Sequence, residues 1–291
     1  MELSNKYRLL VGVLSLLFIG ISFLGWLLIG EVVLIIALGV MLCLFMLVQV
    51  ESHHRIQQAT QQLLQQQRNI EQQKNEIYKQ FQQIESLFSV FSLLRINRPL
   101  PPMGGWAISP DFGKIIVDLV LEKKPKIILE ASSGVSTLIA SYCLKQLGEG
   151  TVISLEEENK YAEFSNKALI KHGLKDIATV IHAPLEEIEI QGKKWIWYDL
   201  TKIKGIKPID MLIIDGPAQY GRVDKMIRYP ALPLLFDSLS DDAIIILDDA
   251  DRKDEKDIVE LWLKQFNCFE VERIDTEKGT VILHRKKAVQ K

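Results

Sequence analysis

Two long apolar segments follow one another at the N-terminus, and they constrain the fold more than any other feature of the chain. Residues 9–29 carry no charge, and after Gly30 and Glu31 a second apolar run covers residues 32–50. Each run approaches the roughly 20 residues that a helix needs to cross the hydrocarbon core of a bilayer. A cleaved signal peptide would have one shorter apolar region followed by soluble sequence, so we do not expect cleavage. The pattern predicts a hairpin of two transmembrane helices over residues 1–50.

The charges that flank this hairpin predict its orientation. Lys6 and Arg8 precede the first run and His53–Arg55 follow the second, whereas Glu31 is the only charge between the runs. Because positive charge collects at the cytoplasmic ends of spans, we expect a two-span protein of the cell membrane with everything downstream in the cytoplasm. Two alternatives stay open: a buried helical pair in a soluble protein, and a hairpin that enters only one leaflet.

Residues 51–98 predict a glutamine-rich helical stalk. The segment contains neither glycine nor proline before residue 95, and six apolar residues recur at seven-residue steps: Ile56, Leu63, Ile70, Ile77, Ile84 and Phe91. This is one seam of a coiled coil. The companion seam is mostly glutamine, which favours a helix but weakens an oligomer. We therefore expect either weak self-association through the stalk or packing of the helix on its own catalytic domain. Pro99 and Pro101-Pro102 end the helix and begin a third domain, residues 99–291.

The third domain has the pattern of a doubly wound α/β sheet. Five short apolar runs alternate with helical stretches such as 136–147 and 159–172, which is typical of parallel strands covered on both faces. Two further strand-like runs, separated by a turn around Gly279, predict a terminal antiparallel hairpin. The seven expected strands are residues 126–131, 151–156, 178–183, 210–214, 243–247, 269–274 and 280–284.

Polar residues follow each of the first five runs, where ligands gather in such sheets. After the first run, Gly134 lies in a turn of small residues that lets a ligand approach the backbone, and the helix behind it offers free amide hydrogens. Glu156 ends the second run, where a carboxylate can accept both hydroxyl hydrogens of a ribose. The other strand ends carry His182 and Ala183, then Asp215, then Asp248 and Asp249.

With these residues identified, the segment from about 101 to 285 resembles the class I S-adenosylmethionine-dependent methyltransferases. The similarity is to a small O-methyltransferase-like branch with an acidic-x-Gly-x-Gly-x-Ser-Thr first loop, and it extends to Gly104-Gly105-Trp106, Ser109-Pro110-Asp111 and Tyr229-Pro230-Ala231. Members of that family have a seven-stranded sheet with an antiparallel end. The resemblance therefore implies a methyltransferase that uses S-adenosylmethionine and transfers the methyl group to oxygen.

The resemblance also implies where the cofactor lies. Glu130 would stand near the methionine end, Glu156 would hold the ribose hydroxyls, and the turn at His182 and Ala183 would border the adenine. The first loop would contribute Ser132, Gly134, Ser136 and Thr137. The family usually has glycine where this chain has Ser132. A serine there can crowd the cofactor or weaken its binding, but serine is small, so we still expect the cofactor to bind.

Catechol-type relatives hold a divalent ion with acidic or amide residues at similar strand ends. By that resemblance Asp215, Asp248 and Asp249 would bind Mg²⁺, and Asp215 and Asp248 would be catalytic, because a bound ion lowers the pKa of an acceptor hydroxyl. The alternative is that Asp215 orients a loop while Asp248 and Asp249 cap the next helix. Arg222 and Arg228 are expected either to grip an anionic acceptor or to lie on a helix surface.

The composition and the predicted location at the membrane limit the remaining classes of function. A net charge of −2 gives no reason to expect nucleic acid as a partner. A nicotinamide-dependent oxidoreductase would show a three-glycine fingerprint that this chain lacks. An inactive membrane scaffold with a methyltransferase-like domain stays open as the alternative. The acceptor is expected to be a small molecule or a lipid-linked compound at the inner leaflet.

Overall fold

The computed structural model describes residues 5–218 and 225–286. The chain divides into two compact units, Met1–Glu76 and Ile77–Lys291. The predicted boundaries at residues 50 and 98 differ from this division and stay predictions.

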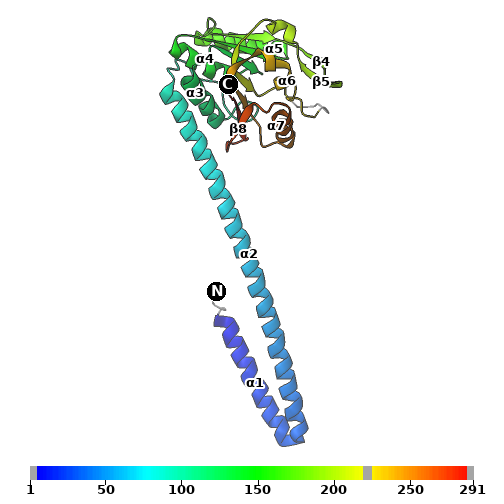
Figure 1. The fold of residues 1–291 in the computed structure, drawn as a ribbon. Coiled ribbons are helices and arrows are strands. Elements are labelled where there is room, and N and C mark those ends of the chain that lie inside the picture. The colour runs from blue at the N-terminus through cyan, green and yellow to red at the C-terminus, as the bar shows by residue number, and fades with distance from the viewer. Residues whose placement is uncertain (1–4, 219–224, 287–291) are drawn as a thin grey trace. The chain divides into compact units, whose positions relative to one another are not determined.

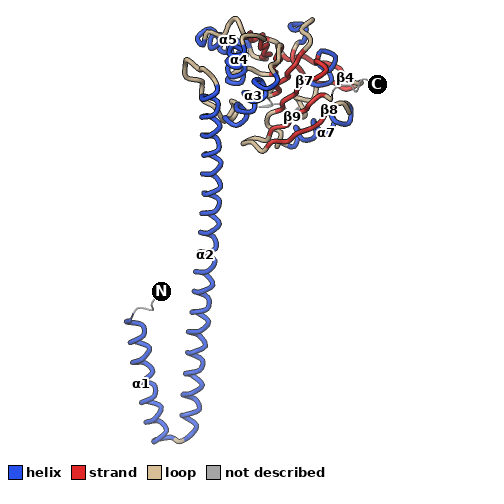
Figure 2. Tube along the Cα trace, turned by 60° about the vertical axis from the view of Figure 1, so that its left-hand side comes forward, coloured by secondary structure: helices blue, strands red, loops and turns tan. Residues whose placement is uncertain are grey.

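The first unit contains two helices joined at one glycine. Helix α1 (Asn5–Ile29) ends directly before Gly30, and helix α2 (Glu31–Leu93) begins directly after it. Gly30 has a φ of 90°, a conformation that residues with a Cβ atom adopt at a cost. Figure 2 shows the two helices doubling back at this point. The expected hairpin of helices is therefore observed, but the second apolar run and the stalk form one continuous helix.

Most described apolar side chains of α1 and of the first part of α2 are exposed. Leu16 and Ile21 of α1 are 71% and 70% exposed, and Ile35 of α2 is 68% exposed. None of the most apolar stretch of α2 is buried, so the alternative of a buried helical pair is not what the structure shows. By length and composition alone, α2 is the one helix among the described residues that could cross a membrane, and Gly12–Leu27 is a shorter apolar helix.

The second unit is built on a seven-stranded mixed sheet of order β3-β2-β1-β6-β7-β9-β8. All seven predicted strands are present: β1 (Ile127–Ala131), β2 (Thr151–Glu156), β3 (Ala178–His182), β6 (Ile209–Ile214), β7 (Leu239–Leu247), β8 (Phe269–Ile274) and β9 (Thr280–Arg285). The first five run parallel, while β9 pairs antiparallel with both β7 and β8. The expected antiparallel end of the sheet is confirmed.

Alternate residues of the central strands enter two separate cores, because successive side chains of a strand point to opposite faces. In β6, Met211 and Ile213 join one core whereas Leu212 and Ile214 join the other. The first core contains side chains of α3 (Pro110–Lys123), α4 (Val135–Leu147) and α5 (Asn159–His172). The second contains those of α6 (Ala231–Leu235) and α7 (Lys253–Gln265). The sheet is thus covered on both faces, as expected, and Figure 1 shows these helices around it.

Two features of this unit go beyond the seven predicted strands. A two-stranded antiparallel sheet of β4 (Leu185–Ile190) and β5 (Lys193–Tyr198) follows β3, and it brings Trp197 and Tyr198 fully into the second core. The last turns of α2 also pack within this unit. Val90 is completely buried in the first core, and the side chain of Gln83 donates to Asp111 Oδ2 over 2.7 Å. The end of α2 therefore packs on the domain, which is one of the two arrangements that we expected for the stalk.

Candidate active site

The order in which strands are added to the sheet reverses between β1 and β6, and the candidate site lies at this point. From β1 the chain builds outward to β2 and β3, and it later returns to add β6 and β7 on the other side. The loops that leave β1 and β6 are joined there, because the backbone N–H groups of Asp215 and Gly216 both donate to the carbonyl of Ala131, over 3.1 and 2.8 Å. A crevice is expected at the carboxyl ends of strands around such a point.

A cavity of 840 Å³ lies at this position. Its volume is within the range of small-molecule sites, about 300–1,000 Å³. The walls come from the loop before α3, the loop after β1, the end of β2, helix α5 and the segments that follow β6, β7 and β8. The residues used below are Trp106, Ser132, Gly134, Ser136, Glu156, Glu157, Tyr161, Phe164, Asp215, Ala218, Arg228, Asp249, Arg252 and Lys278.

The loop after β1 has the backbone of a glycine turn. Ser132 has a φ of 102° and Gly134 a φ of 150°, both in the region that favours glycine. No heavy atom lies within 4 Å of the position that a Cβ atom would take at Gly134. Helix α4 begins at the next residue, and its first N–H groups have no partner within the helix. This turn can therefore receive the polar end of a ligand at close range.

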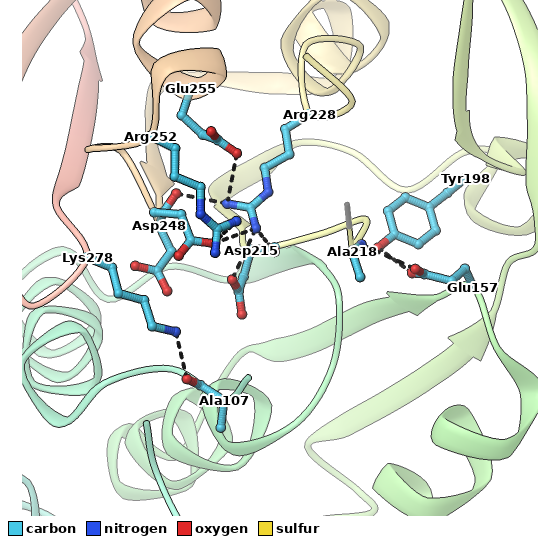
Figure 3. Close-up of polar contacts among 11 residues, drawn as sticks. Ala107, Glu157, Tyr198, Asp215, Ala218, Arg228, Asp248, Arg252, Glu255 and Lys278 are labelled. Carbon is cyan, nitrogen blue, oxygen red and sulfur yellow. Dashed lines mark hydrogen bonds and ion pairs between the residues drawn. The ribbon is translucent and has the colours of Figure 1, made fainter. Parts of the chain in front are cut away.

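Glu156 presents a carboxylate to the cavity at the end of β2. One oxygen accepts from Ser133 Oγ at 2.7 Å, and the other is 3.4 Å from the N–H of Glu158. Burial raises the pKa of this carboxyl, against the Ser133 hydrogen bond, which lowers it. The neighbouring Glu157 accepts from the Tyr198 hydroxyl at 3.1 Å and from the N–H of Ala218 at 3.3 Å, as Figure 3 shows. The Glu156 carboxylate therefore lies where it can accept hydrogen bonds from the two hydroxyl groups of a ribose, which is its predicted role.

Glu130 lies beneath the glycine turn rather than in the cavity wall. It is fully buried, and its Oε2 accepts from Thr137 Oγ1 and Ser154 Oγ, each at 2.5 Å. Thr137 Oγ1 in turn accepts from the N–H of Gly134 at 3.1 Å. Burial raises the pKa of Glu130 to about 7, although the hydroxyls around it act in the opposite direction. Glu130 is therefore placed to hold the turn in position through Thr137.

A second cluster of charges surrounds Arg228, whose side chain is 4% exposed. The guanidinium Nη2 donates to Asp249 Oδ2 at 2.8 Å and to the carbonyl of Asp215, and Nη1 donates to the carbonyl of Asp248 at 2.9 Å. Asp215 Oδ1 and Glu255 Oε1 lie 3.5 and 3.8 Å from its nitrogens. Figure 3 shows Arg228 in the middle of these acidic groups. Burial alone would lower the pKa of Arg228, but the carboxylates of Asp215, Asp249 and Glu255 raise it.

This cluster corrects two expectations. Asp248 and Asp249 do not cap the next helix, because α7 has Arg252 at its N-cap and Asp249 has a φ of 58°. Arg228 is not a surface residue on a helix, since it lies buried in a turn. Arg222 lies outside the described residues.

Two of the three aspartates that were predicted to bind Mg²⁺ already face a positive charge. Asp248 is completely buried and neither of its carboxylate oxygens has a hydrogen-bond partner, while burial and the charges of Asp215 and Asp249 raise its pKa to about 8. The oxygens of Asp215 and Asp249 already face the Arg228 guanidinium. Across residues 5–218 and 225–286, no group of three or more His, Cys, Asp or Glu side chains is arranged to hold a metal ion.

The structure brings only some of the predicted site residues to the cavity. Ser132, Gly134, Ser136, Glu156, Asp215 and Asp249 line it. The others do not: Glu130, Thr137, His182, Ala183 and Asp248 lie outside its lining. Their contacts with a ligand stay predictions.

Sequence reasoning missed several lining residues. Tyr161 and Phe164 of α5 are 51% and 66% exposed there, and Trp106 is 77% exposed. Lys278 reaches the site because β9 pairs with β7, which brings the preceding turn to the carboxyl end of β7. Its Nζ donates to the carbonyl of Ala107 at 2.9 Å (Figure 3). The predicted antiparallel hairpin could have indicated Lys278, because Lys278 lies in the turn of that hairpin.

Comparison with known protein families finds one match. A family model described as a methyltransferase domain matches residues 131–250, the stretch from the end of β1 to just beyond β7. Residues 131–250 form a methyltransferase domain. No curated protein sequence matches the chain significantly.

Several solved structures resemble the chain at low identity. The SAH-bound methyltransferase PaMTH1 of Podospora anserina is 17% identical, with a TM-score of 0.49 over 69% of this chain and 88% of that one. Cofactor-bound Rv0187 from MTB is 18% identical, with a TM-score of 0.49 over 70% and 89%. The O-methyltransferase TomG of Streptomyces achromogenes, solved with SAM, is 14% identical, with a TM-score of 0.48 over 70% and 89%. At these values the likenesses do not establish a shared ligand or substrate.

Proposed function

We propose that this chain is a membrane-anchored, S-adenosylmethionine-dependent methyltransferase that transfers a methyl group to oxygen. The observation that carries the proposal is the position of Glu156 within the methyltransferase domain. Its buried carboxylate faces the same cavity as the glycine turn at Gly134. Together they supply an acceptor for ribose hydroxyls and an open approach to backbone N–H groups, the two contacts that the cofactor needs.

The cofactor, when bound, supplies a methyl group on a sulfonium. The protein's own contribution is to position an acceptor in line with that methyl group and to remove its proton. An acceptor oxygen would form the new bond to the methyl carbon while the carbon–sulfur bond breaks, which leaves a neutral thioether. Asp215 is the carboxylate placed to take the proton, because it lines the cavity and its side chain is 15% exposed. Burial, the largest effect, raises the pKa of Asp215 above its ordinary value, and the positive charge of Arg228 opposes this rise.

Two exposed segments support the membrane part of the proposal. Most of the described apolar side chains of α1 and of the first part of α2 are exposed, and the flanking charges favour a cytoplasmic catalytic domain. The acceptor would then be a small molecule or a lipid-linked compound at the inner leaflet. Washing membranes that contain the full chain with alkaline carbonate should leave it in the pellet. Release into the supernatant would refute the anchor.

We also propose that the chain self-associates weakly through its stalk. Leu63 and Ile70, two members of the predicted seam, are 61% and 63% exposed. Replacing both with glutamine should lower the apparent mass of the full chain in sedimentation at high protein concentration. An unchanged mass would remove the stalk as an interface.

Calorimetric titration of the full chain in mild detergent tests the cofactor. We expect S-adenosylmethionine to bind the wild type, and Glu156→Gln to weaken binding by roughly 10- to 100-fold, because a hydrogen bond to a charged group contributes about 1.5–3 kcal/mol. Glu163→Gln is the matched control, since Glu163 is an exposed residue of α5. Binding of NAD instead would favour the oxidoreductase. A folded chain that binds neither would favour the inactive scaffold.

A further inference from the structure

The cluster around Arg228 has the composition of a cation site that is already filled. Four acidic residues surround it, and they come from three separate elements: Asp215 follows β6, Asp248 and Asp249 follow β7, and Glu255 is in the first turn of α7. Three of the four are as buried as a hydrophobic core residue, with 0%, 3% and 2% exposure for Asp248, Asp249 and Glu255. So many buried carboxyl groups need a positive charge among them.

The guanidinium supplies that charge and faces one carboxylate oxygen each of Asp249 and Asp215, two of the aspartates that a metal ion would need. It contacts Asp249 Oδ2 at 2.8 Å and faces Asp215 Oδ1 at 3.5 Å, while it also binds the carbonyls at the ends of both strands. A magnesium ion requires six oxygen ligands in near-octahedral geometry at about 2.0–2.1 Å. Such an ion and the guanidinium would compete for the same oxygens of the two strand-end aspartates. Arg252 adds a further positive charge, with Nη1 2.9 Å from Asp249 Oδ2.

We propose that Arg228 is the resident cation of this site, and that the domain carries out methyl transfer without a divalent metal ion. The reaction named here rests on the proposed function, but the occupancy of the site by Arg228 does not. Arg228 joins the ends of β6 and β7, holds Asp215 at the cavity, and neutralises the cluster that would otherwise attract a metal. In the absence of an ion to lower the pKa of an acceptor hydroxyl, the proton passes directly to the Asp215 carboxylate.

Binding of Mn²⁺ to the full chain, followed by electron paramagnetic resonance of the free ion, tests the proposal without any acceptor. The wild type should show no saturable one-to-one binding. Arg228→Met removes the charge and leaves the four carboxyl groups, so it should gain one Mn²⁺ site, tighter than any wild-type binding by roughly 10- to 1,000-fold. Arg228→Lys keeps a cation in the cluster and should bind no better than the wild type.

Arg252→Gln is the matched control, because Arg252 touches the same oxygen of Asp249 but is 51% exposed. It should leave Mn²⁺ binding unchanged. An equal gain in Arg252→Gln would show that overall charge, rather than Arg228, excludes the metal, and would overturn the proposal. So would one-to-one Mn²⁺ binding by the wild type that Asp249→Asn abolishes.

The wild-type measurement decides the question even where Arg228→Met fails to fold. A parallel titration with S-adenosylmethionine in the presence of a chelator separates the two proposals. Cofactor binding that fails in a folded chain refutes the methyltransferase function, whereas wild-type Mn²⁺ binding at Asp249 refutes only the role of Arg228.

Discussion

Replacing Ser132 with glycine should stabilise the domain. The backbone at Ser132 has a φ of 102°, and a residue with a Cβ atom pays about 1–3 kcal/mol for such a conformation. Glycine adopts it freely but gives up about 0.5–1 kcal/mol through the greater freedom of the unfolded chain. The net gain should be about 0.5–2 kcal/mol. For a unit of this size each kcal/mol raises Tm by about 2–4 °C, so Tm should rise by about 1–8 °C.

Thermal unfolding of the full chain in mild detergent, followed by circular dichroism, measures this shift. Ser132→Ala is the matched control, because it removes the hydroxyl but keeps the Cβ atom and the strain. Its Tm should stay near that of the wild type. A Tm for Ser132→Gly no higher than that of Ser132→Ala would show that the loop is not strained at this position.

The same pair of variants tests whether Ser132 crowds the cofactor, which is the alternative to undisturbed binding. Ser132 lines the cavity, so removing its Cβ atom gives a ligand more room. S-adenosylmethionine should bind Ser132→Gly at least as tightly as the wild type. Weaker binding, alongside the higher Tm, would mean that the serine side chain contacts the cofactor rather than crowding it.

Two further predictions concern residues around the glycine turn. Because the folded pKa of Glu130 is about 7 and its ordinary value is 4.5, its protonated form is favoured by folding, and stability should fall as pH rises from about 4.5 to 7, by at most about 3 kcal/mol. Glu130→Gln should flatten the dependence of Tm on pH in that range, and an unchanged profile would contradict the assignment. In Gly216→Ala, the new Cβ atom would lie 2.5 Å from the Tyr198 hydroxyl oxygen, so unfolding measurements should show a loss of about 1–3 kcal/mol. Adding Tyr198→Phe should restore part of the loss, and no recovery would place the conflict elsewhere.

The sequence by itself determined the two N-terminal helices and the seven strands of the main sheet, but not the small sheet of β4 and β5. The two apolar runs and the glycine between them predict the helices that meet at Gly30. The apolar runs of the second unit likewise predict all seven strands of its sheet. These features depend on local periodicity, which the order of residues in a short segment carries directly. The same locality explains why the sequence alone predicts residues at strand ends, such as Glu156 and Asp215, to lie at the site.

The tertiary structure alone decided what those side chains contact. Nothing near Arg228 in the chain marks it as the buried partner of Asp249, because burial of a charge depends on groups from distant segments. Glu130 supports the glycine turn because Thr137 and Ser154, which come from two other elements, both donate to its Oε2. Lys278 is at the cavity only through the pairing of β9 with β7. The periodicity of the sequence determines which face of a strand is apolar. Which buried charges pair with one another is determined only when separate elements pack together.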